Sequence, residues 1–91
     1  MPLTRGAFRA YEYDRMVVLF SMMDEQAEVP CAISTAAMDD LEKSTRTAAD
    51  KREEQFLRLR DRIEERAARK FNDRELEGTP RGIVLRSIDF R

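Results

Sequence analysis

The segment from Thr47 to Asn72 constrains the fold most, because it is the longest periodic stretch in the chain. It contains no Gly or Pro and is rich in Ala, Leu, Glu, Arg and Lys, residue types that favour helices. Its apolar residues recur every three or four positions and form one stripe, which comprises Phe56, Leu59, Ile63, Ala67 and Phe71. Thr47 is a favourable N-cap, with Asp50 at the capping-box spacing. We expect one long amphipathic helix over residues 47–72, with a stripe that another layer must cover.

The charged residues of this helix separate into two flanks. A basic flank lies between about 200° and 280° from Phe56 and comprises Lys51, Arg58, Arg62, Arg66 and Arg69. An acidic flank lies between about 60° and 180° and comprises Asp50, Glu53, Glu54, Asp61, Glu64 and Glu65. Two i,i+4 pairs, Glu54–Arg58 and Glu65–Arg69, have a favourable orientation. Arg60 falls at about 40°, on the edge of the stripe, where its guanidinium needs a partner or a path to water. The two flanks predict either a solvated, ion-paired helix surface or a surface whose charges determine which elements pack beside the helix.

Three strands are predicted before the helices. The segment Phe8 to Tyr13 alternates between two faces, and a tight turn follows it. The segment 16–22, MVVLFSM, is apolar on both faces, as expected of a central strand. The segment 28–33, EVPCAI, is a third short strand, in which Pro30 cannot donate to a ladder. We expect these segments to form an antiparallel meander with the third strand at an edge of the sheet.

A short helix and a last strand complete the pattern. Ser34 is a plausible N-cap for a helix from Thr35 to about Lys43, whose acidic residues favour a position beside the basic flank. Within it, Asp39 and Asp40 point about 100° apart, and we expect both to be solvated. Turn-forming residues end the long helix after Asn72, and the segment 82–90, GIVLRSIDF, reads as a strand.

These elements predict an α+β fold for a single small domain over residues 1–91. Its two layers are a four-stranded, mainly antiparallel sheet and one short and one long helix, which cover one face of the sheet. The order along the chain is β-β-β-α-α-β. Because Pro30 favours an edge position for the third strand, we expect the last strand beside the first.

The composition points to a cytoplasmic protein. The chain has one cysteine, so an intramolecular disulfide is excluded, and no apolar run approaches the length of a transmembrane helix. The first residues, MPLTRGAFRAYEYD, lack the apolar core of a signal peptide. The net charge of −1 lacks the basic excess that is typical of nucleic-acid-binding domains. We therefore expect no membrane association and no general affinity for nucleic acid.

The chain offers few groups for catalysis or metal binding. It has no histidine, which removes the commonest general base near neutral pH and the Ser-His-Asp and Cys-His arrangements. Its glycines do not form a phosphate-binding loop, and one cysteine with carboxylates makes a poor zinc site. Cys31 is expected to be a small buried apolar residue. We predict no catalytic residues, no metal and no cofactor.

A set of residues in a fixed order resembles a known family. The set comprises Val18, Phe20, Asp24, Glu28, Val29, Pro30, Cys31, Ile33, Ser34, Ala37 and Met38, then Phe56, Arg60, Ile63, Glu64, Ala67 and Lys70, then Leu85, Ser87, Asp89 and Phe90. In this order and spacing the chain resembles the small bacterial proteins of domain of unknown function family 1488. The resemblance spans most of the chain. It implies an α+β fold with a three-stranded meander, helices and a closing strand, and it implies no activity. Arg60 matches the recurring arginine of that pattern.

Three functions remain open. We favour a non-enzymatic interaction or regulatory module that binds a second copy or a protein partner, because exposed methionines such as Met22 and Met23 are typical of adaptable contact surfaces. The second is a weak nucleic-acid-associated regulator that uses the basic flank. The third is an enzyme or small-ligand site around Arg60, Cys31 and Tyr11. The candidate interaction residues are Arg60, Arg58, Arg62, Met22, Met23 and Cys31.

Overall fold

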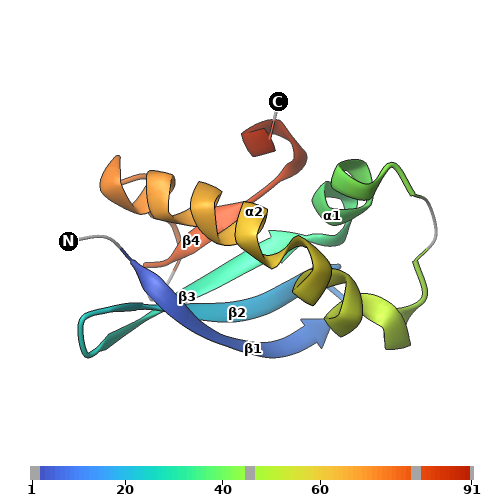
Figure 1. Ribbon diagram of the computed structural model, residues 1–91, viewed down its shortest axis with the longest axis horizontal. Coiled ribbons are helices and arrows are strands. Elements are labelled where there is room, and N and C mark those ends of the chain that lie inside the picture. Colours follow the sequence, from blue (N-terminus) through green and yellow to red (C-terminus); the bar gives the residue numbers. More distant parts are fainter. Residues whose placement is uncertain (1–2, 45–46, 79–80, 91) are drawn as a thin grey trace.

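The computed structural model describes residues 3–44, 47–78 and 81–90. Its strands are β1 (Thr4–Glu12), β2 (Val17–Asp24), β3 (Ala27–Ser34) and β4 (Ile83–Leu85). Its helices are α1 (Thr35–Glu42) and α2 (Arg52–Asn72), and two 3₁₀ turns are η1 (Ala49–Lys51) and η2 (Ser87–Phe90). Both α-helices lie over the same face of the sheet, so the molecule has two layers (Figure 1). The predicted α+β fold, with one short and one long helix on a mostly antiparallel sheet, is confirmed.

The four strands follow the order β1-β2-β3-β4 across the sheet. The first three pair antiparallel, which confirms the meander, whereas β4 runs parallel to β3. The predicted position of the last strand beside the first is therefore wrong, because β1 and β4 form opposite edges. Two parallel strands that follow each other in the chain need a long crossover connection. Between β3 and β4 this connection is the segment that contains α1 and α2.

The strand that contains Pro30 is an interior strand, not an edge. The ladder between β3 and β4 covers only residues 31–33 of β3, so it begins just after Pro30. Next to this point, a Cβ on Gly82 would lie 2.3 Å from the carbonyl oxygen of Pro30. Because Pro30 lies outside the ladder with β4, its lack of a backbone N–H removes no hydrogen bond to that strand. Gly82 has no Cβ and so lets the backbones of the two segments approach closely.

The first strand begins at Thr4, earlier than the predicted start at Phe8. Gly6 makes this possible, because a Cβ there would lie 2.2 Å from the carbonyl oxygen of Ser21 on β2. Beside it the pairing is irregular, and the amide N–H of Ala7 donates to Ser21 Oγ at 3.1 Å. The buried hydroxyl of Ser21 thus replaces a ladder partner. The predicted ends of β2 and β3 lie within two residues of the observed ones.

The apolar stripe of α2 packs on the sheet, as predicted. Phe56 has its ring centroid 5.0 Å from that of Phe20 on β2 and 5.9 Å from that of Phe8 on β1. The strands contribute alternate residues to this core, namely Val18, Phe20, Met22, Val29, Cys31, Ile33, Ile83 and Leu85. The intervening residues of each strand point to the face that carries no helix.

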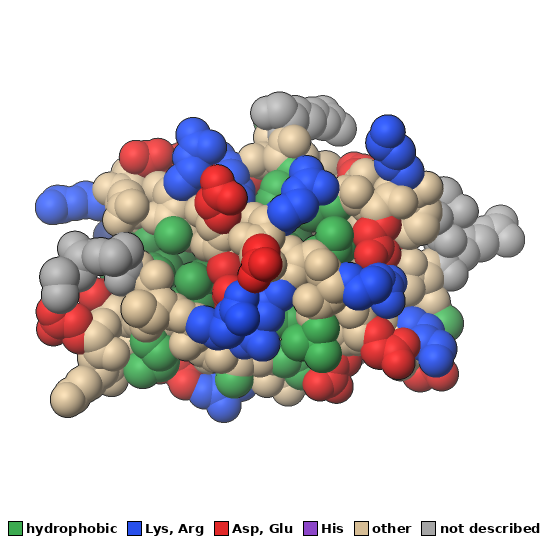
Figure 2. All heavy atoms as spheres, in the orientation of Figure 1, with side chains coloured by type: hydrophobic (Ala, Val, Ile, Leu, Met, Phe, Trp, Pro, Cys, Tyr) green, Lys and Arg blue, Asp and Glu red, His purple; other side chains and the backbone are tan. Residues whose placement is uncertain are grey.

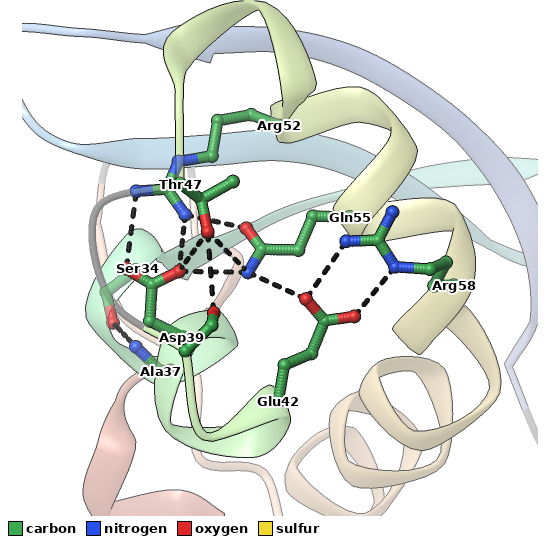
Figure 3. A network of polar contacts seen from close by, with 9 residues as sticks. Ser34, Ala37, Asp39, Glu42, Thr47, Arg52, Gln55 and Arg58 are labelled. Carbon is green, nitrogen blue, oxygen red and sulfur yellow. Dashed lines mark hydrogen bonds and ion pairs between the residues drawn. The ribbon is translucent and has the colours of Figure 1, made fainter.

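A buried polar network joins the two helices (Figure 3). Asp39 Oδ1 on α1 accepts hydrogen bonds from Arg52 Nη1 at 2.8 Å, Gln55 Nε2 at 2.9 Å and Thr47 Oγ1 at 2.9 Å. Thr47 is therefore not the N-cap of the long helix, which starts at Arg52 after the η1 turn. The expectation that Asp39 is solvated is also wrong, since its side chain is only 18% exposed. Asp40 is exposed as expected.

The environment of Asp39 favours its charged form. Burial raises the pKa of Asp39, but the hydrogen bonds from Arg52, Gln55 and Thr47 outweigh burial and bring the pKa below its ordinary value of 3.8. Glu42, one turn further along α1, accepts from Gln55 Nε2 at 3.2 Å and from Arg58 Nε at 2.8 Å. The short helix therefore lies beside the basic flank, as predicted, and its predicted cap is confirmed by Ser34 Oγ, which accepts from an amide in the first turn.

The chain turns after β4 instead of continuing as a strand to Phe90. The carboxylate of Asp89 accepts from the amide N–H of Arg86 at 2.7 Å, which closes the η2 turn. Lys70 Nζ lies 3.2 Å from Asp89 Oδ1, and Arg66 Nε donates to the backbone oxygen of Asp89 at 2.6 Å. These contacts fix η2 against the last turns of α2.

Candidate functional site

Arg60 connects α2 to the first strand. Its Nη2 donates to the carbonyl oxygen of Gly6 at 2.8 Å, and its Nε donates to Glu64 Oε2 at 3.0 Å. The guanidinium also lies 5.8 Å from the ring centroid of Phe56. Glu64 additionally accepts from Arg5 Nε at 2.8 Å. A guanidinium at the edge of the apolar stripe needs hydrogen-bond partners. Arg60 finds them in Glu64 and Gly6 of the same chain.

The contacts of the described residues do not support the small-ligand site predicted around Arg60, Cys31 and Tyr11. Arg60 lines none of four of the best-formed cavities among the described residues. Cys31 is buried, as expected, and desolvation raises the pKa of its thiol to about 12. A thiol with this pKa is protonated at neutral pH and is a weak nucleophile. Neither Arg60 nor Cys31 therefore provides an observation in favour of the third function, which stays a prediction.

The two methionines of β2 lie on opposite faces of the sheet. Met22 is buried in the core, so its expected exposure is wrong. Met23 is half-buried and pairs with Glu28 of β3 at the far end of the strand, on the face without helices. Only Met23 is therefore available to a partner.

The basic flank is partly used inside the molecule. Arg58 forms a two-pronged contact with Glu42, and Lys51 lies 3.6 Å from Glu54. Neither predicted i,i+4 pair, Glu54–Arg58 or Glu65–Arg69, forms in the described part of the chain. Figure 2 shows basic and acidic side chains interleaved on one side of the molecule, rather than one continuous basic area. On this side of the molecule the basic flank therefore does not form one continuous area of cations, and the nucleic-acid alternative stays a prediction.

The uncovered face of the sheet carries an apolar row that crosses every strand. The row runs through Ala10, Leu19, Ala32 and Val84, which are directly paired neighbours on β1, β2, β3 and β4. A sheet with one solvated face normally presents polar residues there. We name this row and its half-buried neighbour Val17 the apolar row.

Two shallow cavities lie along the apolar row at the β4 side. One, of about 330 Å³, has Leu19, Pro30, Ala32 and Val84 among its lining residues. The other, of about 620 Å³, includes Val17 and Val84 and extends to Ile88 of η2, whose side chain is 69% exposed. Arg15, Glu77 and Gly78 border both cavities. The uncovered face is thus a grooved apolar surface with a polar border.

The border of this face consists of ion pairs between arginine and glutamate. Arg9 of β1 pairs with Glu28 of β3, Arg15 pairs with Glu12 at 3.0 Å, and Arg86 pairs with Glu77 at 2.8 Å. The hydrogen bonds from Arg86 lower the pKa of Glu77, so this carboxylate is charged at neutral pH. The border therefore presents both signs of charge in equal number.

Comparison with known proteins identifies the family of the chain. A family model described as "Protein of unknown function (DUF1488)" matches residues 5–81. The chain belongs to the DUF1488 family. The crystal structure of a protein of unknown function from this family, from Shewanella loihica PV-4, has a TM-score of 0.75 to this structure at 15% sequence identity. That match covers 91% of this chain and 94% of the other, and it shows the shared fold. No curated protein matches the chain.

The uncovered face of the DUF1488 fold was not predicted as a site. The alternation of β2 and β3 contained the necessary information, because Leu19 and Ala32 occupy outward positions with apolar side chains. The segment 16–22 was interpreted as apolar on both faces, which does not distinguish a strand covered on both sides from a strand with an exposed apolar face. The segment 28–33 was interpreted only as a short edge strand, because of Pro30. Within residues 3–44, 47–78 and 81–90, no helix has the length and hydropathy to span a membrane, and no three acidic or cysteine side chains are grouped as metal ligands.

Proposed function

We propose that this DUF1488 protein is a non-enzymatic, cytoplasmic interaction module that self-associates through the uncovered face of its sheet. The observation that supports the proposal is the apolar row, which crosses all four strands on the face without helices. Ala10 of this row is exposed, Leu19 and Val84 are half-buried and Ala32 is buried. A contiguous apolar surface that is partly exposed and has a polar border is characteristic of protein–protein contact sites. Sheets commonly pack face to face through such residues.

The charges at the border favour a second copy of the chain over a strongly charged partner. A two-fold symmetric contact brings each border group against the border of the other copy. Because Arg9, Arg15 and Arg86 stand among Glu12, Glu28 and Glu77, each copy offers an acid for every arginine of the other. A partner with one dominant sign of charge would meet as many repulsive groups as attractive ones.

The exposed apolar residues near one end of this face extend the same surface. Ile88 lines the larger cavity together with Val17, and Met16, which precedes Val17, is 57% exposed. Burying side chains of this kind contributes about 1.5–3 kcal/mol each when contact is complete. The contact that we propose therefore involves the apolar row at its centre and Ile88 at its margin.

Sedimentation equilibrium from micromolar to millimolar concentration tests this function. We expect the wild-type chain to form a dimer that Leu19→Lys and Ile88→Asp convert to monomer. Leu57→Lys is the matched control, because Leu57 is 47% exposed on α2, on the other layer. Ile88→Asp alters an exposed side chain and so leaves folding intact. A wild-type chain that stays monomeric, or a Leu57→Lys variant that dissociates as much as Leu19→Lys, would contradict the proposal.

A further inference from the structure

A second surface, formed by the end of α2, the end of α1 and η2, contains two adjoining cavities. One, of about 200 Å³, is lined by Arg62, Glu65, Arg66, Arg69 and Phe90. The other, of about 420 Å³, is lined by Asp40, Leu41, Lys43, Arg62, Ser87 and Phe90. Because Arg62 and Phe90 line both, the two cavities meet at these side chains. We name this pair of cavities the α2–η2 groove.

Three of the four cations that line the α2–η2 groove have no carboxylate partner in the described part of the chain. Arg66 is held by Asp89, with Nη2 3.6 Å from Oδ1. The other three cations are Lys43, Arg62 and Arg69. Within residues 3–44, 47–78 and 81–90 they form no ion pair and no side-chain hydrogen bond, in contrast to other cations of α2 and its start. The helix arginines recur after four and then three residues, so they project from one side of α2.

The two cavities differ in chemistry. The smaller one has three arginines and one carboxylate, Glu65, so its lining is strongly basic. Guanidinium groups bind phosphate oxygens in a planar, two-pronged geometry. The larger one has the size of a small-molecule site and offers the carboxylate of Asp40, the hydroxyl of Ser87 and apolar Leu41. Phe90 is half-buried against the core and lines both cavities, so the exposed part of its ring offers a planar group a surface for stacking.

From this arrangement we infer that the α2–η2 groove binds a small phosphate ester that carries a planar ring, such as a nucleoside monophosphate. The phosphate contacts Arg62 and Arg69 in the smaller cavity, and the ring packs on Phe90 in the larger one. Arg66, which is held by Asp89, also lines the phosphate cavity. This site uses α1, α2 and η2 and is independent of the uncovered sheet face.

Calorimetric titration of the full chain with AMP at low salt tests this inference. We expect saturable binding that is weaker for inorganic phosphate and for adenosine, since each fills only one cavity. Arg62→Gln and Arg69→Gln should each weaken AMP binding about tenfold, because each removes a charge-assisted contact. Added salt should weaken binding by the wild-type chain.

Arg58→Gln is the matched control, because Arg58 belongs to the same basic flank but is already paired with Glu42. This variant should keep wild-type affinity for AMP. Arg62 is exposed and unpaired among the described residues, so Arg62→Gln should also keep the wild-type melting temperature, which separates lost binding from lost folding. The inference is overturned if AMP does not bind, if Arg58→Gln weakens binding as much as Arg62→Gln, or if a single-stranded oligonucleotide binds while AMP does not.

Discussion

Three buried carboxylates determine how α2 sits in this molecule. Asp39 anchors its first turn, Glu64 ties its middle to β1, and Asp89 ties its end to η2. Each is opposed by buried or half-buried cations of the long helix, namely Arg52, Arg60, Arg66 and Lys70. Removing one member of such a pair leaves the other charge uncompensated in a poorly solvated place. These positions are therefore expected to be sensitive to single substitutions.

Asp39→Ala is expected to destabilise the fold by about 3 kcal/mol, because it leaves the buried guanidinium of Arg52 without its carboxylate partner and removes one acceptor from the amide of Gln55. Asp40→Ala, at the neighbouring exposed position, is expected to change stability by less than about 0.5 kcal/mol. The free energies of unfolding come from urea denaturation of both variants. Equal effects at the two positions would show that the network does not stabilise the native state.

The same carboxylates predict the response of stability to pH. Hydrogen bonds lower the pKa of Asp39 and Asp89 below 3.8 in the folded chain despite burial, which opposes this shift. Folding therefore gains stability from them above pH 3.8, and this gain is lost as pH falls through the lower folded values. In urea denaturation across this acid range, Asp39→Asn should lose less stability than the wild-type chain. A variant whose stability falls as steeply as that of the wild type would contradict this expectation.

Cys31 is expected to be inert in the native state. With a pKa of about 12 and a buried side chain, its thiol contains almost no thiolate at neutral pH. A disulfide reagent should label the native chain only as fast as the chain opens, and should label it quickly in denaturing urea. Native labelling as fast as labelling in urea would show that Cys31 is accessible.

At the scale of elements, local patterns predicted α1 and the stripe of α2, and long-range pairing determined the rest. The N-cap at Ser34 and the spacing of the apolar stripe depend only on residues close together in the chain, so both could be predicted from the sequence. The start of α2 was predicted too early, because Thr47 bonds to Asp39 rather than capping a helix. The order of the strands was missed, since the rule applied to Pro30 ignores that β4 reaches only residues 31–33 of β3. The pattern predicted the basic flank, but it could not show that Arg58 pairs with Glu42 whereas Arg62 pairs with no carboxylate among the described residues, because this depends on where Glu42 lies.

The close approach of β1 and β2 makes Gly6 the critical residue of the first strand. Gly6→Ala is expected to cost about 1–3 kcal/mol, because its Cβ would lie 2.2 Å from the backbone oxygen of Ser21. Thr4→Ala, on the same strand at an exposed position, should have a much smaller effect. Thermal unfolding of both variants provides the comparison. A Gly6→Ala variant as stable as Thr4→Ala would show that the strands can separate at this point without cost.

At the scale of the whole molecule, two different surfaces remain after the core is accounted for. The helices cover one face of the sheet, and the opposite face keeps the apolar row uncovered (Figure 1). The α2–η2 groove is polar and basic, and lies where the ends of the helices meet the last turn. In our proposals the uncovered sheet face binds a second copy and the α2–η2 groove binds a small anion, so the two contacts would lie on separate surfaces.

The central claim is that the uncovered sheet face is the contact between two copies, and intermolecular NOEs in a mixture of isotope-labelled and unlabelled chains test it most directly. We predict NOEs from the methyl groups of Leu19, Val84 and Ile88 to the unlabelled copy, because these side chains lie on or beside the apolar row. The methyl groups of Leu57, which is exposed on α2, should show none in the same spectrum. Intermolecular NOEs from Leu57 alone, or none from any residue at millimolar concentration, would contradict the account.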